Sequence, residues 1–171
     1  ACFVLPVEDS LPEIFESLKN MAIVQQSGGG TGFAFSHLRP RGDNVRSTRG
    51  VASGPISFMR MFNAATEVVK QGGKRRGANM GILRVDHPDI LRFIQAKAKD
   101  ELANFNLSVA VTNAFMEAEK KGERIPLINP RTGKPTETVS ARKIFEAVVT
   151  NAWRSGEPGM LFLDRIEQDN P

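Results

Sequence analysis

Short apolar, strand-like segments alternate with longer amphipathic, helix-like segments along the chain, and this alternation is the feature that most constrains the fold. Parallel strands need a crossover between them, and a helix is the usual crossover. The alternation therefore predicts an α/β fold with a mainly parallel sheet or barrel. No internal repeat is visible in the sequence.

The individual elements follow from periodicity and from capping residues. We expect strands at residues 2–7, 33–38, 80–85, 107–111 and 159–163, and we expect the first and the last of them to be buried. Helices are expected after Ser10, which opens a capping box, at residues 55–71, 86–94 and 112–121, and after Ser140. Residues 125–138 carry a hairpin signature. The helix at 55–71 has a broader apolar face than one partner would cover.

Composition limits the class of protein. The chain has 171 residues, of which 40% are hydrophobic, so we expect one globular unit. It begins at Ala1 and enters an apolar stretch at once, which we interpret as a cut into a longer chain. No apolar run approaches the roughly 20 residues of a membrane span, so a cytoplasmic protein without membrane contact is expected. One cysteine and two histidines predict no internal disulfide and no metal site.

Charge indicates the kind of ligand. The net charge is +4, and Arg and Lys gather between Arg39 and Arg76, which favours an anionic ligand. Aromatic residues do not interleave with these cations, as a base-stacking surface for single-stranded nucleic acid would require. We therefore expect small phosphorylated ligands and no nucleic acid.

Two glycine-containing stretches are candidates for ligand contact. Residues 27–32 lack the Lys-Ser/Thr ending of a phosphate loop and precede a strand, so a helix stop is the favoured interpretation. Residues 71–79 combine small residues with three cations, which suits a mobile backbone with guanidinium groups for phosphates or base edges. The alternative for this second stretch is a solvated basic turn.

Four motifs in order resemble those of ribonucleotide reductase catalytic subunits. They are Ala1-Cys2-Phe3-Val4-Leu5-Pro6, Ser27-Gly28-Gly29-Gly30-Thr31-Gly32-Phe33, Val51-Ala52-Ser53-Gly54-Pro55 and Gln71-Gly72-Gly73-Lys74-Arg75-Arg76-Gly77-Ala78-Asn79-Met80-Gly81. The resemblance is closest to the adenosylcobalamin-dependent class, which Arg84-Val85-Asp86-His87-Pro88-Asp89-Ile90 also resembles.

The resemblance implies a fold and a reaction. The family's fold is a ten-stranded α/β barrel made of two antiparallel halves of five parallel strands, and residues 1–171 would form the first half. The implied reaction makes deoxyribonucleotides: a thiyl radical removes the 3′ hydrogen of a ribonucleotide, the 2′ hydroxyl leaves as water, and two thiols supply the electrons. Cys2 matches one of those thiols, although a small buried apolar role is its alternative. Because the second thiol and the radical cysteine are absent, the segment alone should be inactive.

The resemblance also assigns ligand contacts within a specificity region at about residues 9–79. The substrate would meet Ala1, Cys2, Gly30, Gln71 and Arg75. A deoxynucleoside triphosphate or ATP effector would meet Asp9, Ser10 and Leu11 through its sugar and base, Arg39 and Arg46 through its phosphates, and Lys70 nearby. Gly72, Gly73, Lys74, Arg76, Gly77, Ala78 and Asn79 would complete the loop that links effector to substrate. The alternative for Asp9 is a helix-start carboxylate, and for Arg39 a solvated cation.

The resemblance further implies a ribonucleoside di- or triphosphate substrate, adenosylcobalamin held mostly by other segments, and a thioredoxin-like or thiol reductant. It implies a homodimer paired through the helix at residues 55–71. A noncatalytic nucleotide-binding regulatory module is the competing hypothesis, and Cys2 argues against it, because a pure binding module has no use for that thiol. His37 and His87 are expected to be surface or packing residues. Half a barrel would leave open strand edges, so we expect the isolated segment to aggregate or to need a partner.

Overall fold

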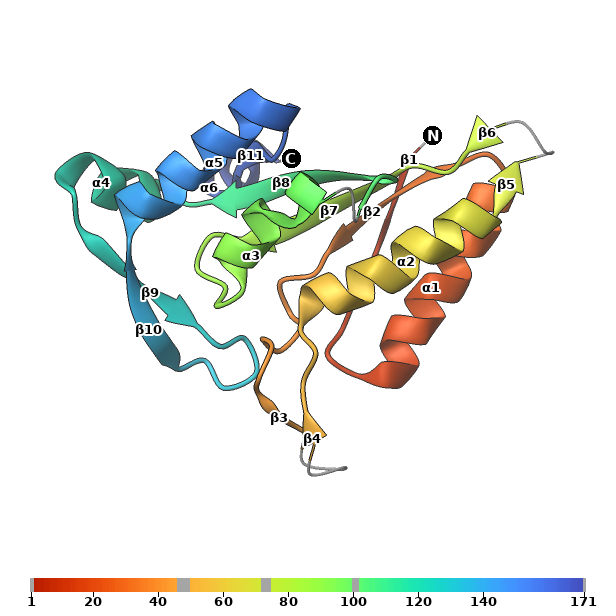
Figure 1. The fold of residues 1–171 in the computed structure, drawn as a ribbon, viewed down its shortest axis with the longest axis horizontal. Coiled ribbons are helices and arrows are strands. Elements are labelled where there is room, and N and C mark those ends of the chain that lie inside the picture. Colours follow the sequence, from red (N-terminus) through yellow and green to blue (C-terminus); the bar gives the residue numbers. More distant parts are fainter. Residues whose placement is uncertain (1, 46–49, 72–74, 100–101, 171) are drawn as a thin grey trace.

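A computed structural model describes residues 2–45, 50–71, 75–99 and 102–170, and its centre is a five-stranded parallel sheet (Figure 1). The strands lie in the order β1 (Cys2–Leu5), β2 (Gly30–Ala34), β7 (Asn79–Arg84), β8 (Phe105–Val111) and β11 (Gly159–Phe162). Every neighbouring pair is parallel. The expected α/β class and the half-barrel set of five parallel strands are confirmed.

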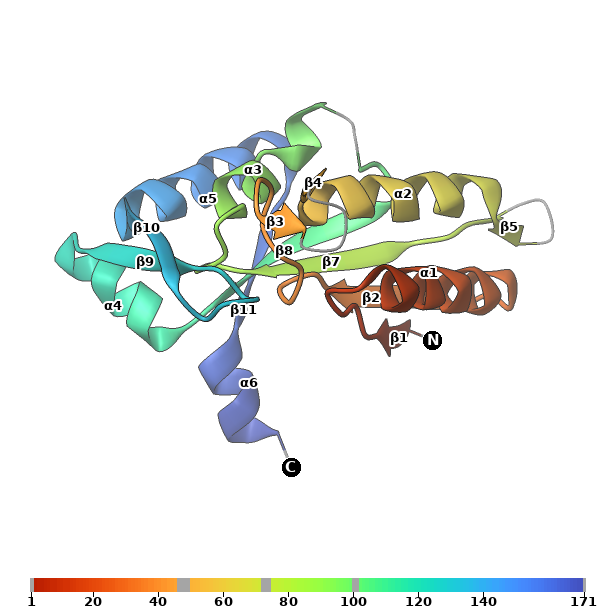
Figure 2. The same cartoon turned by 90° about the horizontal axis from the view of Figure 1, so that it is seen from below.

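Helices and small hairpins connect these strands. The helices are α1 (Leu11–Gln26), α2 (Pro55–Val68), α3 (Ile90–Ile94), a 3-10 turn (Ala96–Lys99), α4 (Asn113–Lys121), α5 (Ala141–Ser155) and α6 (Leu163–Asp169). The hairpins are β3 (Asn44–Val45) with β4 (Gly50–Val51), β5 (Lys70–Gln71) with β6 (Arg75–Arg76), and β9 (Arg124–Ile128) with β10 (Pro135–Ser140). Figure 2 shows α2, α3 and α5 on one side of the sheet and α6 on the other.

Aromatic side chains fill the space between the sheet and α2. Phe62 of α2 meets Phe33 and Phe35 edge-on, with ring centroids 4.9 and 5.7 Å away, and all three are fully buried. Gly81 of β7 allows the helix to approach the sheet, since a Cβ there would lie 2.7 Å from Met59 Cε. This packing fixes α2 over β2 and β7.

The first helix begins and ends at capping residues that the sequence signals. The Ser10 hydroxyl accepts a hydrogen bond from Glu13 N at 3.4 Å, as the predicted cap requires. At the other end Gly28 has φ 101°, its N–H donates to Gln25 O, and Gly29 N donates to Val24 O. This is a Schellman motif, so the helix-stop interpretation of the glycine stretch is confirmed.

Four expectations about elements are wrong. The helix expected at 86–94 is α3 and begins at Ile90, because residues 85–89 form turns in which His87 N donates to Arg84 O and Ile90 N donates to His87 O. The strand expected at 33–38 is β2 and begins at Gly30, because the chain is already extended after the Schellman turn. The helix expected at 55–71 ends at Val68, because Lys70 and Gln71 form a hairpin with Arg75 and Arg76. The terminal strands, expected to be buried, are largely exposed, with Val4 86% and Phe162 44% accessible. They are the outer strands of the sheet, so each has one neighbouring strand among the described elements.

Candidate functional site

Cys2 and Gly30, which are two of the expected substrate contacts, lie side by side at the amino ends of the first two strands. The parallel register of β1 and β2 pairs Cys2 directly with Gly30. The Cys2 thiol is exposed, in contrast to the buried strand expected there. Gly29 packs tightly beside this pair, since a Cβ there would lie 2.6 Å from Val24 Cγ1 and 3.0 Å from the Phe3 ring. The turn therefore brings bare backbone next to an accessible thiol. Ala1 lies outside the described residues.

The basic loop is a short β-hairpin, β5 with β6, and it lies at the amino end of β7, on the same side as the amino ends of β1 and β2. Gln71 and Arg75, the two residues expected to contact the substrate base, are paired in its register, and Lys70 pairs with Arg76. Gly72, Gly73 and Lys74 lie outside the described residues. Asn79 follows the hairpin as the first residue of β7 and is paired with Thr31 of β2. The structure thus brings Cys2, Gly30 and the hairpin together at the amino ends of β1, β2 and β7.

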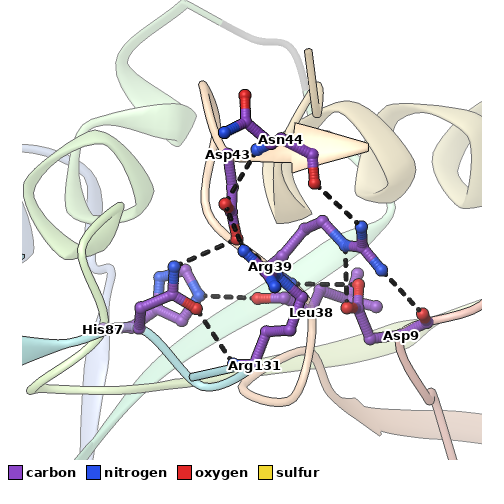
Figure 3. A network of polar contacts seen from close by, with 8 residues as sticks. Asp9, Leu38, Arg39, Asp43, Asn44, His87 and Arg131 are labelled. Atoms are coloured by element: carbon purple, nitrogen blue, oxygen red, sulfur yellow. Dashed lines mark hydrogen bonds and ion pairs between the residues drawn. The ribbon is translucent and has the colours of Figure 1, made fainter. Parts of the chain in front are cut away.

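Asp9 and Arg39, which are expected effector contacts, form an ion pair beyond the carboxyl ends of β1 and β2 (Figure 3). Arg39 Nε donates to Asp9 Oδ2 at 2.8 Å, and Arg39 N donates to Asp9 Oδ1 at 3.1 Å. Arg39 Nη1 also donates to Asn44 O at 3.3 Å. Arg39 is therefore neither fully solvated nor alone, because Asp9 orients its guanidinium.

Ser10 and Leu11 continue directly from Asp9. Ser10 caps α1, and Leu11 is 60% exposed at its first turn. Arg46 lies outside the described residues. Lys70 belongs to the hairpin and so lies with the substrate group, at the C-terminal ends of α1 and α2 (Figure 1). Within one chain, the expected effector contacts therefore fall into two groups separated by the length of α1, about 24 Å for its 16 residues.

A second ion pair, which sequence reasoning missed, borders the Asp9 and Arg39 pair (Figure 3). Arg131, in the turn between β9 and β10, donates through Nη2 and Nε to the two Asp43 carboxylate oxygens at 2.7 and 2.9 Å. Asn129 Nδ2 donates to Asp43 Oδ2 at 3.0 Å. The Arg131 hydrogen bonds hold the pKa of Asp43 well below its usual range. The hairpin of β9 and β10 is thus bound to the loop that carries Arg39.

The two histidines are packing and surface residues, as expected. His87 is buried: its Nε2 donates to Leu38 O at 2.9 Å, and its Nδ1 accepts from Asp89 N at 3.0 Å. His37 is exposed beside Glu8, with Nδ1 3.1 Å from the carboxylate. Among the described residues there is no group of three His, Cys, Asp or Glu side chains that could hold a metal ion. No described helix is long and apolar enough to cross a membrane.

Comparison with known proteins identifies the family. Residues 1–171 match the family described as "Ribonucleotide reductase, barrel domain". The chain belongs to the ribonucleotide reductase family. It is 54% identical over 173 residues to the vitamin B12-dependent ribonucleoside-diphosphate reductase of Thermoplasma acidophilum, covering 100% of this chain and 22% of that protein. It is 53% identical over 172 residues to the protein of the same name from Mycobacterium tuberculosis, covering 99% of this chain and 25% of that one.

A solved ribonucleotide reductase has the same fold. The class Id ribonucleotide reductase alpha subunit of Actinobacillus ureae superposes with a TM-score of 0.79 at 22% identity, over 99% of this chain and 28% of that subunit. At this identity the likeness concerns the fold alone. The chain thus spans about a quarter of the length of the ribonucleotide reductases that it matches.

Proposed function

We propose that the protein is a vitamin B12-dependent ribonucleotide reductase and that this chain carries one of its reducing cysteines and its allosteric specificity site. Family membership and the names of relatives at 53–54% identity support the reaction class. The observation that carries the cysteine assignment is the register that sets the exposed Cys2 opposite Gly30. A thiol beside an unencumbered glycine backbone suits close approach of a ribose.

The proposed reaction replaces the 2′ C–O bond of a ribonucleotide with a C–H bond and releases the hydroxyl as water. Two thiols are oxidised to a disulfide and supply the two electrons and two protons that this requires. Cys2 would be one of them, and the second thiol and the radical cysteine would come from segments beyond these 171 residues. An external dithiol of the thioredoxin kind would then reduce the disulfide. A strand holds the Cys2 thiol in a fixed position, which favours transfer of its electron and proton to the same ribose carbon in every turnover.

The substrate would lie at the amino ends of the strands, beside Ala1, Cys2, Gly30 and the hairpin of β5 and β6. Gln71 and Arg75 are paired in the hairpin register, and we propose that both contact the base. An amide and a guanidinium are donors suited to base edges. Diphosphates are the preferred substrate class, because the relatives from Thermoplasma acidophilum and Mycobacterium tuberculosis are both named ribonucleoside-diphosphate reductases.

The effector, a deoxynucleoside triphosphate or ATP, would bind beyond the carboxyl ends of β1 and β2. Asp9 would accept hydrogen bonds from its sugar, Ser10 and Leu11 would border its base, and Arg39 with Arg46 would contact its phosphates. Asp9 already orients the Arg39 guanidinium, and a triphosphate is a stronger acceptor than the Asn44 carbonyl that this group meets now. Lys70 belongs to the other group of this chain, so it could join the site only from a second copy.

A two-fold dimer would bring the two groups together. The helix α2 has 14 residues and is about 21 Å long, with the Arg39 loop near its start and the hairpin of β5 and β6 at its end. If α2 packs antiparallel against its copy, the hairpin of one protomer comes to Asp9 and Arg39 of the other. Exposed apolar side chains support this surface, although more lie on α1 than on α2: Leu11, Phe15, Ile23 and Val68 are 60%, 53%, 57% and 82% accessible.

Cobalamin, the cofactor named for the relatives, finds no fit among the described residues of this chain. Imidazole is the commonest side-chain ligand of metal ions, but both ring nitrogens of His87 already have partners. His37 lies beside Glu8 after the carboxyl end of β2, whereas Cys2 lies at the amino end of β1. The Cys2 edge offers strand backbone and the Phe3 ring. We therefore assign the cofactor contacts to other segments of the protein.

The experiment is Cys2→Ser in the full-length enzyme, assayed with a thiol reductant. We expect multiple turnover to be lost and effector binding by calorimetry to be retained, since Cys2 lies away from Asp9 and Arg39. A thiol titration after a single turnover should show the loss of two thiols in the wild type. Unchanged steady-state turnover would remove the assignment. Retained effector binding with no ribonucleotide reduction by the wild type would favour the regulatory module instead.

A further inference from the structure

Four polar side chains are buried together in the core where α1, β2, α2 and β7 meet. They are Gln25, Thr31, Thr66 and Asn79, and their accessibilities are 0%, 3%, 1% and 3%. Each of them belongs to a different element. Apolar side chains such as Met21, Phe33 and Phe62 surround them in the same core. Burial of so many polar groups is costly unless they pair with one another, so their mutual geometry is under strong constraint.

Their hydrogen bonds form a directed network. Gln25 Nε2 donates to Asn79 Oδ1 at 2.8 Å and to Thr31 Oγ1 at 3.2 Å. Thr31 Oγ1 donates to Asn79 Oδ1 at 2.7 Å. Asn79 Nδ2 donates to Thr66 Oγ1 at 2.8 Å, and Thr66 Oγ1 donates to Phe62 O at 2.9 Å. Each amide thus donates to at least one partner inside the network.

The network surrounds the base of the hairpin that contains β5 and β6. Thr66 lies on the last turn of α2, just before the hairpin, and Asn79 lies just after it. Gly77 packs against the Gln25 amide so closely that a Cβ there would lie 2.5 Å from Gln25 Oε1. Thr31 N donates to Ala78 O at 3.1 Å, and Thr31 directly follows Gly30. The entry and the exit of the hairpin and the strand beside Cys2 are thus tied to a single cluster.

One acceptor in the network has no partner. Gln25 Oε1 is buried and receives no hydrogen bond from any described residue. It faces the backbone of Gly77, as the close approach of a Gly77 Cβ indicates. A hairpin arrangement that turned a backbone N–H onto this oxygen would gain a buried hydrogen bond. The cluster therefore links the position of the hairpin base to the hydrogen bonding of this buried oxygen, and coupling between two sites requires a shared element of this kind.

We infer that Gln25, Thr31 and Thr66 are positioning residues that set the hairpin strands β5 and β6 relative to Gly30 and so transmit effector identity to substrate choice. This inference rests on the proposed function. None of the three residues is itself one of the proposed ligand contacts. They act through Asn79 and Gly77, whose places in the chain join the hairpin to the sheet.

The test uses Gln25→Met and Thr66→Val in the full-length enzyme, with Ser17→Ala as the matched control. Ser17 lies on α1 as Gln25 does, is 3% accessible, and its hydroxyl has no hydrogen-bond partner among the described residues. Reduction of competing ribonucleotides is measured with each effector and without one. In the two network variants we expect the effector-induced change in substrate preference to fall by roughly 5- to 150-fold. Effector affinity should be retained, and Ser17→Ala should behave as the wild type.

The outcomes separate this inference from the proposed function. Full effector-dependent selectivity in folded Gln25→Met and Thr66→Val enzymes would overturn the inference while leaving the function intact. A wild type that reduces no ribonucleotide, or ignores every effector, would count against the proposed function itself. Thermal unfolding distinguishes general loosening from lost positioning. If selectivity falls in step with the unfolding midpoint in all three variants, Ser17→Ala included, the network has no specific role.

Discussion

At the scale of single residues, buried polar side chains fix local geometry near the proposed effector site. His87 holds the Leu38 carbonyl with one ring nitrogen and the Asp89 amide with the other. Leu38 directly precedes Arg39, so the imidazole positions the backbone that carries the proposed phosphate contact. Since Nδ1 accepts a backbone N–H, the ring is neutral with its proton on Nε2.

His87 makes stability depend on pH. Burial lowers the pKa of His87 below its ordinary value of 6.5. The unfolded chain therefore binds a proton at a higher pH than the folded protein does, and stability falls as the pH drops below about 6.5. We expect the unfolding midpoint of the full-length enzyme to decrease between about pH 7 and pH 5, and the decrease to be smaller in His87→Gln. Denaturation at several pH values measures this, and equal slopes in both proteins would contradict it.

Arg39 gives a prediction about binding. Loss of a hydrogen bond to a charged group costs about 1.5–3 kcal/mol, so Arg39→Ala should weaken deoxynucleoside triphosphate binding by about that amount. Calorimetry on the full-length enzyme measures it. Arg142→Ala is the matched control, because Arg142 is also paired with a carboxylate, Glu119 at 3.3 Å, but joins α5 to α4. Equal affinity in Arg39→Ala and the wild type would defeat the effector assignment for Arg39.

At the scale of elements, local signals in the sequence predicted much and long-range contacts limited the rest. The caps at Ser10, Thr112 and Ser140 all accept the expected backbone N–H, because capping depends on residues three positions apart. The end of α2 was wrong because the pairing of Lys70 and Gln71 with Arg76 and Arg75 overrides helical periodicity. Asp43 and Arg131 are 88 residues apart, so their pairing follows from the fold alone. Gln25 was missed for the same reason, since 54 residues separate it from Asn79.

The contact of α2 with β7 gives a prediction at this scale. A side chain at Gly81 would meet Met59 Cε at 2.7 Å and the Phe105 ring at 3.1 Å, both in the closed core. Overpacking of this kind costs about 1–3 kcal/mol, so Gly81→Val should lower the free energy of unfolding by that amount. Chemical denaturation measures it. In Gly32→Ala the new methyl group would meet Met80 Cβ at 3.9 Å, so this variant should lose much less. Equal losses in the two variants would argue against the close approach.

At the scale of the whole molecule, the sheet has two outer strands, and both carry exposed apolar side chains. Phe3 and Val4 lie on β1, and Phe162 lies on β11, followed by Ile166 on α6. Such edges can pair with further strands. The described part of the chain therefore has the architecture of half a closed structure, in agreement with the family's barrel.

This architecture predicts how the 171-residue chain behaves alone. We expect it to associate or aggregate when expressed without the rest of the protein, because the outer strands and their apolar side chains stay uncovered. Sedimentation velocity over a range of concentrations measures the association. A monomer with a sharp and reversible thermal transition would show that the half sheet is self-sufficient. The full-length protein serves as the comparison in the same buffer.

The separation of Arg39 from the hairpin along α2 has a consequence for inheritance. In the proposed dimer, each effector site takes its arginine from one copy and its hairpin from the other. When a chain with a defective arginine pairs with a chain with a defective hairpin, both defects fall on the same site and the other site is intact. Two alleles that each lose effector control alone would then restore regulated synthesis together. Placing both defects on one allele would abolish that rescue.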